Sequence, residues 1–245
     1  MAISSRDPFP HLPPYELLYA ERVPLVHVFT NLVRGLGLRY VKVKGGEWET
    51  PRPKSLDVLS HSDRLLFVEC GVYLGNSLVA CSKIARDYSV PIHMYGLDTF
   101  SGLPELSDMD LKLSPENAVY RQNKLFSDTS LDMVQKSIDN EGLSDCITLI
   151  PGLFADTLKL LPSSQYFSFV HIDCDLYEPH LECLEFFYPR MEKGGIIFFD
   201  DYHSVEFPMA KEAIDKFMEG RPENLFHLSF GPSQPNFTKT FIVKD

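Results

Sequence analysis

Four aspartates stand in two short segments whose spacing suggests chemistry. Asp173 and Asp175 follow one apolar run, and Asp200 and Asp201 follow a second. Short apolar runs without alternation are typical of parallel strands covered on both faces, and open α/β sheets bind ligands at the carboxyl ends of such strands. Carboxylates gathered at one sheet edge repel one another, and a hard divalent cation such as Mg²⁺ relieves that repulsion. The pattern predicts a metal site; the alternative is that each aspartate only caps the following helix or turn.

A glycine turn forms a second candidate site. The apolar run that ends at Cys70 is followed by Gly71 and Gly75 and then by a helical pattern that continues to Tyr88. Such a turn lets a ligand approach the backbone, and the helix N-terminus offers N–H groups. Three residues separate the two glycines, so the Gly-x-Gly-x-x-Gly pattern for a pyrophosphate is absent. Glu69 suits a cofactor with a positive charge or ribose hydroxyls, although a purely structural turn remains equally open.

Asp98 strengthens the case for a nucleoside cofactor. It ends the next apolar run, 29 residues after Glu69. In a doubly wound sheet, an acid at the end of the second strand lies where a ribose sits, and a carboxylate accepts two hydroxyl hydrogens well. Phe154 follows a later strand, where its ring either stacks on a base or fills the core. The sequence therefore predicts a nucleoside pocket beside the acidic cluster.

These residues require an α/β sheet to position them. Apolar runs between turn and helix patterns predict seven strands, at residues 65–70, 92–98, 147–150, 167–173, 195–200, 226–230 and 238–244. The connection at residues 231–236 is too short for a crossover helix, so the last strand should return antiparallel. We predict a Rossmann-like, doubly wound, seven-stranded mixed sheet over residues 61–245, with an N-terminal helical extension.

Two segments lie outside this sheet pattern. Residues 1–60 should form an arm and a helical cap, because residues 1–14 hold four prolines and residues 15–38 show apolar side chains at helical spacing. The helices could cap the mouth of the site, contact a partner subunit in a homo-oligomer, or lean on the core. Residues 99–127 form a long connection with little pattern, which suggests a lid.

Composition limits the possible partners and compartment. The chain has 245 residues, 44% of them apolar, and a net charge of -11. This suits one domain with a sizeable core, and the acidic balance argues against binding to nucleic acid or anionic membranes. We expect a small or neutral substrate and a cytoplasmic location, since the chain shows no secretory signal pattern and no membrane-length apolar run. The five cysteines lack metal-ligand spacing and should be reduced packing residues.

The chain resembles the class I S-adenosylmethionine-dependent methyltransferases, and within them the macrocin O-methyltransferase family, which methylates sugar hydroxyls of natural products. The resemblance covers roughly residues 65–244. It depends on five blocks in order: VECGVYLG at 68–75, YGLDTFSGLPE at 95–105, GLFADTL at 152–158, HIDCDLY at 171–177 and GGIIFFDDY at 194–202.

The resemblance implies a role for each candidate residue. The implied cofactor-binding residues are Glu69 and Gly71 on the methionine and ribose side, Asp98 at the ribose hydroxyls, Phe154 and Ala155 at the adenine, and Ser101, Gly152 and Asp173 from the matching blocks. The implied Mg²⁺ ligands are Asp173, Asp200 and Asp201, and Asp175 is the implied general base. Metal polarisation of a bound hydroxyl beside a base suits methyl transfer to oxygen. Asp175 could instead orient a metal-bound water.

The sequence departs from the family at the first glycine block, where Tyr73-Leu74-Gly75-Asn76 replaces the usual Trp-Arg-Gly-Gly. We therefore expect altered contacts near the methionine tail. The expected acceptor is a hydroxyl of a sugar or of another small natural product. The alternatives are a metal-independent methyltransferase acting on nitrogen or protein, a nucleotide-binding oxidoreductase, and an inactive binding module.

Overall fold

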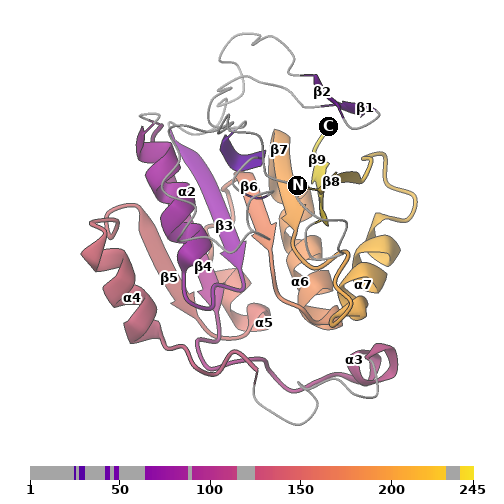
Figure 1. Ribbon diagram of the computed structural model, residues 1–245, viewed down its shortest axis with the longest axis horizontal. Helices are drawn as coiled ribbons and strands as arrows, with labels where there is room; N and C mark the ends of the chain where they lie inside the picture. Colours follow the sequence, from indigo (N-terminus) through magenta and orange to yellow (C-terminus); the bar gives the residue numbers. More distant parts are fainter. Residues whose placement is uncertain are drawn as a thin grey trace, which may run out of the picture.

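The computed structural model describes residues 25, 28–30, 42–44, 47–49, 64–87, 90–114, 125–229 and 238–245 (Figure 1). Its main feature is a seven-stranded sheet of order β5-β4-β3-β6-β7-β9-β8. The strands are β3 (Leu65–Cys70), β4 (Ile92–Asp98), β5 (Ile147–Pro151), β6 (Phe167–Ile172), β7 (Met191–Phe199), β8 (Phe226–Ser229) and β9 (Thr238–Val243). The five neighbouring strands β5, β4, β3, β6 and β7 pair in parallel, and β9 runs antiparallel to β7 and β8. The predicted mixed sheet with an antiparallel last strand is confirmed.

Helices cover both faces of this sheet (Figure 1). They are α2 (Asn76–Asp87), α3 (Asp108–Leu113), α4 (Leu131–Asn140), α5 (Phe154–Thr157), α6 (Tyr177–Phe187) and α7 (Pro208–Met218), with 3-10 turns η4 (Leu158–Leu160) and η5 (Tyr188–Arg190). Strands β1 (Lys42–Lys44) and β2 (Glu47–Glu49) form a separate antiparallel pair. None of the helices within the described ranges is long and apolar enough to span a bilayer.

The central strands are mostly apolar because both of their faces are buried. All six residues of β3 and all six of β6 are buried, and alternate side chains enter opposite cores. Phe67 and Phe169 lie in the core on the α2 side, where their rings stack with centroids 5.1 Å apart. Their neighbours Val68 and Val170 lie in the core that α6 and α7 cover. The unalternating sequence pattern therefore has its expected cause.

Four described residues of the N-terminal extension are helical and buried: Leu25, Val28, Phe29 and Thr30. The Phe29 ring meets the rings of Phe67 and Phe169 edge-on, both at 5.4 Å. These contacts lie on a face of the sheet, as expected for a helix that leans on the core. Apart from these residues and strands β1 and β2, the predicted arm and helical cap lie outside the described residues.

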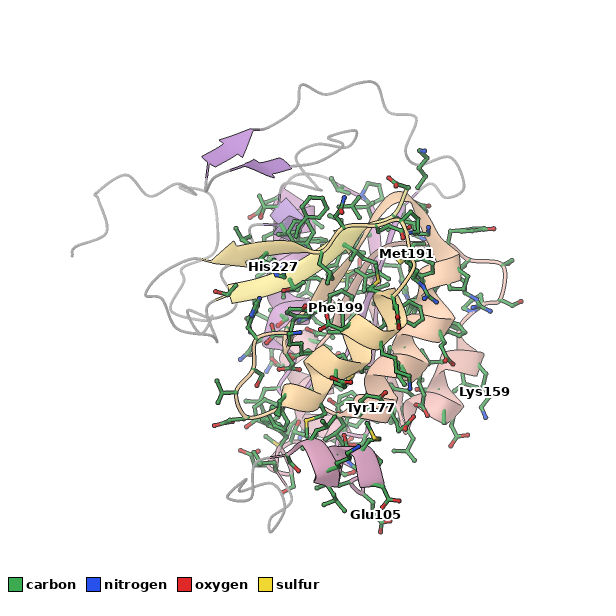
Figure 2. The ribbon with its side chains drawn as sticks, turned by 90° about the vertical axis from the view of Figure 1, so that its right-hand side faces the viewer. Glu105, Lys159, Tyr177, Met191, Phe199 and His227 are labelled. Atoms are coloured by element: carbon green, nitrogen blue, oxygen red, sulfur yellow. The ribbon has the colours of Figure 1, made fainter. Side chains whose placement is uncertain are left out.

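The segment predicted as a lid contains helix α3, which lies beyond the carboxyl ends of the strands (Figure 1). Ser107 and Asp110 form a reciprocal capping box at its N-terminus. Leu106 and Met109 pack against a small apolar cluster that includes Tyr177 and Phe207. In the view of Figure 2, Tyr177 lies close to α3, and Met191 lies toward the opposite end of the sheet. Residues 115–124 of this segment lie outside the described residues.

Two boundaries are set by features that the apolar pattern does not show. Helix α6 begins at Tyr177, and its α-helical part ends at Phe187, because Pro189 sits in the first turn of η5. Strand β7 starts at Met191, four residues before the predicted start, and its pairing with β6 shifts register between Phe167 and Phe169. An irregularity of this kind leaves no trace in an apolar pattern.

Candidate active site

The parallel register brings four predicted site residues to one edge of the sheet. Cys70 pairs with Leu97 and with Ile172, and Ile172 pairs with Phe199. The residues that follow are therefore level with one another: Gly71, Asp98, Asp173 and Asp200. Backbone hydrogen bonds extend the ladders past the strand ends, including Asp173 N to Cys70 O at 2.8 Å and Asp200 N to Ile172 O at 3.0 Å. The carboxylates are consequently placed by rigid backbone.

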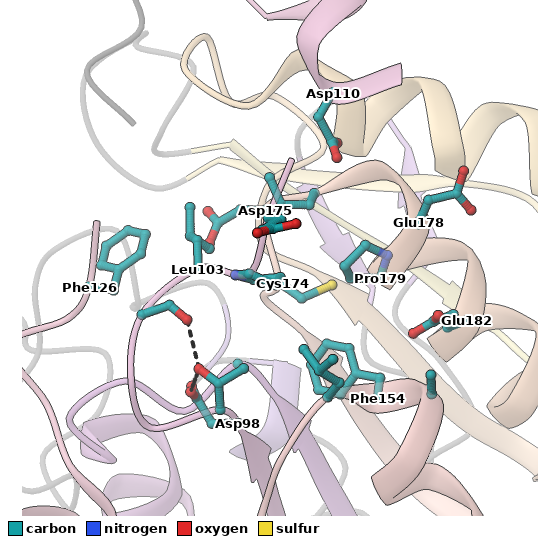
Figure 3. Close-up of a pocket in the computed structure, with 18 of the residues that line it drawn as sticks. Asp98, Leu103, Asp110, Phe126, Phe154, Cys174, Asp175, Glu178, Pro179 and Glu182 are labelled. Carbon is teal, nitrogen blue, oxygen red and sulfur yellow. Dashed lines mark hydrogen bonds between the residues drawn. The ribbon is translucent and has the colours of Figure 1, made fainter. Parts of the chain in front are cut away.

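A cavity of about 350 Å³ opens at this edge (Figure 3). Its lining includes six of the eight predicted cofactor-binding residues, namely Gly71, Asp98, Gly152, Phe154, Ala155 and Asp173, together with Asp175. Glu69 and Ser101 lie outside this lining. Glu69 is 1% exposed and contacts His171, and Ser101 is exposed. Their contacts with a cofactor stay predictions.

The Asp98 carboxylate is held by backbone donors. Its Oδ2 accepts hydrogen bonds from the N–H groups of Val72 at 2.7 Å and Tyr73 at 2.9 Å, and its Oδ1 accepts one from Phe100 N–H at 2.7 Å. These bonds fix the glycine turn against the end of β4. A carboxylate oxygen has more than one lone pair, so Asp98 can still accept from hydroxyl groups in the cavity.

Gly71 is required by close packing. Its φ angle is +90°, and a Cβ atom added to it would lie 1.8 Å from the carbonyl oxygen of Asp173. No side chain fits at that separation. The glycine therefore lets the backbones at the ends of β3 and β6 approach each other at the edge of the cavity.

Asp175 projects into the cavity from a strained loop (Figure 3). Its φ angle is +61°, in the left-handed region that non-glycine residues seldom adopt. Asp201 supports the loop, because its Oδ2 accepts a hydrogen bond from Asp175 N–H at 3.2 Å. Both residues are buried. Strain of this kind clusters at functional sites, where surrounding contacts maintain it.

Three side chains form a candidate metal site. His171, Asp173 and Asp200 each offer a ligand atom, and these atoms lie within 4.8 Å of one another. Carboxylate oxygens and an imidazole nitrogen at this spacing fit a divalent cation. Asp173 and Asp200 belong to the predicted ligand set; Asp201 is absent from this group of three, and its place as a ligand stays a prediction. His171 was missed, although it precedes Asp173 by two residues and so shares its face of the strand.

Buried cations balance these acids. His171 Nδ1 lies 2.8 Å from Glu69 Oε1, and Lys239 Nζ lies 2.5 Å from Asp200 Oδ2. Burial alone would lower the pKa of His171, but the carboxylates of Asp200 and Glu69 outweigh it and raise this pKa to about 9. Lys239 comes from β9 and is 3% exposed. Nothing in the local sequence of Lys239 marks this pairing.

The side of the cavity formed by α3 and α6 holds further acids that the sequence pattern did not predict. Asp110 of α3 is 1% exposed, and its Oδ1 accepts a hydrogen bond from Tyr177 N–H at 2.8 Å. This bond ties the predicted lid to the start of α6. Glu178 and Glu182 line the cavity from α6, and burial, followed by repulsion from Glu178, raises the pKa of Glu182. Only a three-dimensional arrangement brings α3 and α6 to one cavity.

Relatives with curated functions match the same region. The chain is 28% identical over 163 residues to demethyldecarbamoylnovobiocin O-methyltransferase of Streptomyces niveus. This match covers 66% of this chain and 61% of that protein. It is 29% identical over 137 residues to 8-demethyl-8-(2,3-dimethoxy-alpha-L-rhamnosyl)-tetracenomycin-C 4'-O-methyltransferase of Streptomyces olivaceus. This match covers 55% of this chain and 52% of that protein. The match therefore spans less than two thirds of each relative's length.

Solved structures share the fold. The O-methyltransferase NovP superposes with a TM-score of 0.66 at 21% identity, over 91% of this chain and 80% of its own. The calicheamicin methyltransferase CalS11 superposes with a TM-score of 0.65 at 20% identity, over 94% of this chain and 82% of its own. Residues 64–225, well over half of the chain, match the pattern of the family described as macrocin-O-methyltransferase (TylF). The chain belongs to the macrocin-O-methyltransferase (TylF) family.

Proposed function

We propose that the protein is an O-methyltransferase that moves the methyl group of S-adenosylmethionine to a hydroxyl of a sugar or of another small natural product. Family membership and the two O-methyltransferase relatives support this proposal. The observation that carries it is Asp175, a buried carboxylate held at φ +61° in a cavity that the aligned strand ends also line. A base fixed in this way beside a cofactor pocket suits proton removal from a bound hydroxyl.

The cofactor would occupy the part of the cavity at the ends of β3, β4 and β5. Gly71 would leave room for the backbone to approach the ligand, and Asp98 would accept from the ribose hydroxyls. Phe154 and Ala155, which line the cavity after the turn at Gly152, would border the adenine. The sulfonium charge is attracted by the acids of the lining, among them Asp173 and Asp175.

Asp175 would act as the general base. Its carboxylate takes the hydroxyl proton while the acceptor oxygen forms a bond to the methyl carbon and the carbon–sulfur bond breaks, releasing S-adenosylhomocysteine. A divalent cation, expected to be Mg²⁺ and held by Asp173, Asp200 and Asp201, would polarise the acceptor hydroxyl when bound. The chain itself contributes orientation, since reacting atoms must lie in line for methyl transfer.

A test uses the full chain with S-adenosylmethionine labelled in its methyl group and a panel of neutral glycosides and polyphenols. We expect label in a hydroxyl ether of at least one acceptor and its loss when a chelator is added. Label on nitrogen or protein, or turnover that resists the chelator, would favour a metal-independent methyltransferase. Calorimetric binding of NAD in preference to S-adenosylhomocysteine would favour an oxidoreductase. No turnover with any acceptor, despite cofactor binding, would favour an inactive binding module.

The remaining expectations accompany this proposal. They are a small hydroxylated acceptor as the partner, no nucleic-acid or membrane partner, a homo-oligomeric assembly and a cytoplasmic location. Residues 99–127 would act as the lid over the acceptor, tied to α6 by the bond between Asp110 and Tyr177.

A further inference from the structure

We infer that His171 supplies a nitrogen ligand to the divalent cation, so that the site expected to take Mg²⁺ binds a first-row transition metal such as Mn²⁺ more tightly than Mg²⁺. This inference rests on the proposed function, because the cation belongs to the same site. It concerns a residue that neither the acidic pattern of the sequence nor the family resemblance assigns. Its support is the position of the imidazole, its fixed orientation and the charges around it.

The imidazole nitrogen Nε2 is buried and directed at the acids. His171 is 0% exposed, and its Nε2 makes no hydrogen bond within the described structure. Asp200 Oδ1 lies 3.5 Å from this nitrogen, and Asp173 completes the group. That separation is long for an N–H···O hydrogen bond, which prefers 2.7–3.2 Å. Neighbouring ligands of one metal ion, each bound at roughly 2.1 Å, lie roughly 3.0 Å apart in octahedral and roughly 3.4 Å apart in tetrahedral geometry, which is near the separation seen here.

Glu69 fixes the orientation of the ring. Its Oε1 lies 2.8 Å from His171 Nδ1, and its side chain is fully enclosed by the core. A proton on Nδ1 is donated to this carboxylate, and a cation that binds would displace the second proton of the charged ring, which frees the Nε2 lone pair on the side of Asp173 and Asp200. A carboxylate behind the imidazole is the usual support of a metal-binding histidine, because it sets the tautomer and raises the basicity of the ligand nitrogen. This gives the buried Glu69 a role without contact to the cofactor.

Lys239 contacts the other carboxylate oxygen of Asp200. Its Nζ contacts both Oδ2, at 2.5 Å, and the backbone oxygen of Asp200, at 3.1 Å. The ammonium group therefore engages Oδ2 and directs Oδ1 toward His171. It also cancels one negative charge, so the site attracts a cation less strongly by charge alone. A site with reduced charge and a nitrogen donor depends more on the preference of the metal for that donor.

The donor set decides the class of metal. Mg²⁺ favours oxygen ligands and retains water, whereas imidazole suits transition metals, whose affinity for nitrogen ligands rises along the first row. One nitrogen with two carboxylates is consistent with Mn²⁺, Fe²⁺, Co²⁺ or Zn²⁺. Mn²⁺ is the convenient probe because it is paramagnetic.

The experiment uses the full-length protein, stripped with a chelator and titrated with Mn²⁺. Electron paramagnetic resonance counts the bound ions, and pulsed measurements detect nitrogen coupled to Mn²⁺. We expect one bound Mn²⁺ with a single nitrogen coupling, and displacement that requires at least tenfold more Mg²⁺ than Mn²⁺. In His171→Gln we expect loss of the coupling and a fall of at least tenfold in the ratio of Mn²⁺ to Mg²⁺ affinity. None of these readouts needs turnover.

The matched control is His203→Gln. His203 Nε2 lies 3.2 Å from His227 Nδ1 at a partly exposed position away from the acids of the candidate metal site. We expect His203→Gln to keep the nitrogen coupling. If this variant lost the coupling, the nitrogen would belong to the surface pair of histidines, and the inference would be contradicted. Mn²⁺ bound without nitrogen coupling in the unmodified protein would also overturn it, even if His171→Gln does not fold. A protein that binds metal in this way but methylates nothing would instead refute the proposed function.

Discussion

The two halves of the strand edge stabilise their carboxylates by different means. In the nucleoside half, at the ends of β3, β4 and β5, Asp98 is held by three backbone N–H groups. In the acidic half, at the ends of β6, β7 and β9, Asp200 is balanced by the buried side chains of Lys239 and His171. Backbone donors come with the fold, whereas side-chain cations come from distant strands and can be removed one at a time. Substitutions should therefore affect cofactor affinity in the first half, and turnover and stability in the second.

The largest effect is expected from Asp175→Asn. Asparagine also tolerates the left-handed backbone conformation, so the loop should keep its shape while the base is lost. General-base catalysis typically contributes about 10²- to 10⁴-fold, and we expect kcat to fall in that range. Cofactor affinity, measured by calorimetry with S-adenosylhomocysteine, should change less than about threefold. A variant with unchanged kcat would remove Asp175 as the base.

The second effect is on stability, in Lys239→Met. The substitution keeps the aliphatic stem but leaves Asp200 buried without its ammonium partner. Breaking a buried pair from one side costs about 3–5 kcal/mol, so the free energy of unfolding in urea should fall by about that much. Lys211→Met, which breaks the exposed pair with Asp215 on α7, is the control and should cost less than about 1 kcal/mol. Equal losses in both variants would show that burial does not distinguish the two pairs.

The same contrast separates what the sequence could predict from what it could not. The aligned acids Asp98, Asp173 and Asp200 were predictable, because each directly ends or follows an apolar strand and parallel strands end at one edge. The antiparallel last strand was predictable from the length of its connection. Lys239 was not, because its distance from Asp200 depends on the register between β7 and β9. Glu178 and Glu182 of α6 likewise line one cavity with Asp110 only because α3 packs against the start of α6, which the sequence does not show.

His171 is an intermediate case. Its place two residues before Asp173 assigns it to the same face, and strand geometry could have included it. The sequence could not show that Glu69, 102 residues away, sits behind its ring. An acid next to a glycine turn is equally consistent with a contact to the cofactor. Only the position of His171 on the neighbouring strand β6 shows that Glu69 contacts an imidazole.

A smaller effect is expected from Asp98→Asn in the nucleoside half. The amide cannot accept at both positions, so the variant loses bonds to the glycine turn and to the ribose hydroxyls. Hydrogen bonds to a charged group contribute about 1.5–3 kcal/mol, and the Kd of S-adenosylhomocysteine should rise about 10- to 100-fold. Asp156→Asn, an equal charge change at an exposed position of α5, should leave this Kd unchanged. If kcat fell and the affinity for S-adenosylhomocysteine did not, Asp98 would affect turnover and not cofactor binding, and the proposed difference between the two halves would be wrong.

The last effect is a pH dependence that belongs to the acidic half. His180 on α6 is fully buried, and its Nδ1 lies 2.8 Å from the carbonyl oxygen of Leu176, directly after the Asp175 loop. Burial lowers the pKa of His180 to about 4, partly offset by its bond to Leu176. Because the unfolded chain takes up the proton near pH 6.5 and the folded chain does not, stability is complete above pH 6.5 and falls as the pH drops toward 4.

Between pH 7 and pH 5 this histidine should cost about 2 kcal/mol of unfolding free energy. His180→Asn tests the assignment, since an asparagine amide can donate to the same carbonyl oxygen but does not titrate. The difference between unmodified protein and variant, followed by urea unfolding at both pH values, should shrink as the pH falls. A constant difference would mean that His180 takes up its proton in the folded state as readily as in the unfolded chain, and so is charged at pH 5. In that case the acidic half would hold a third buried cation, and its balance of charges would differ from the one described.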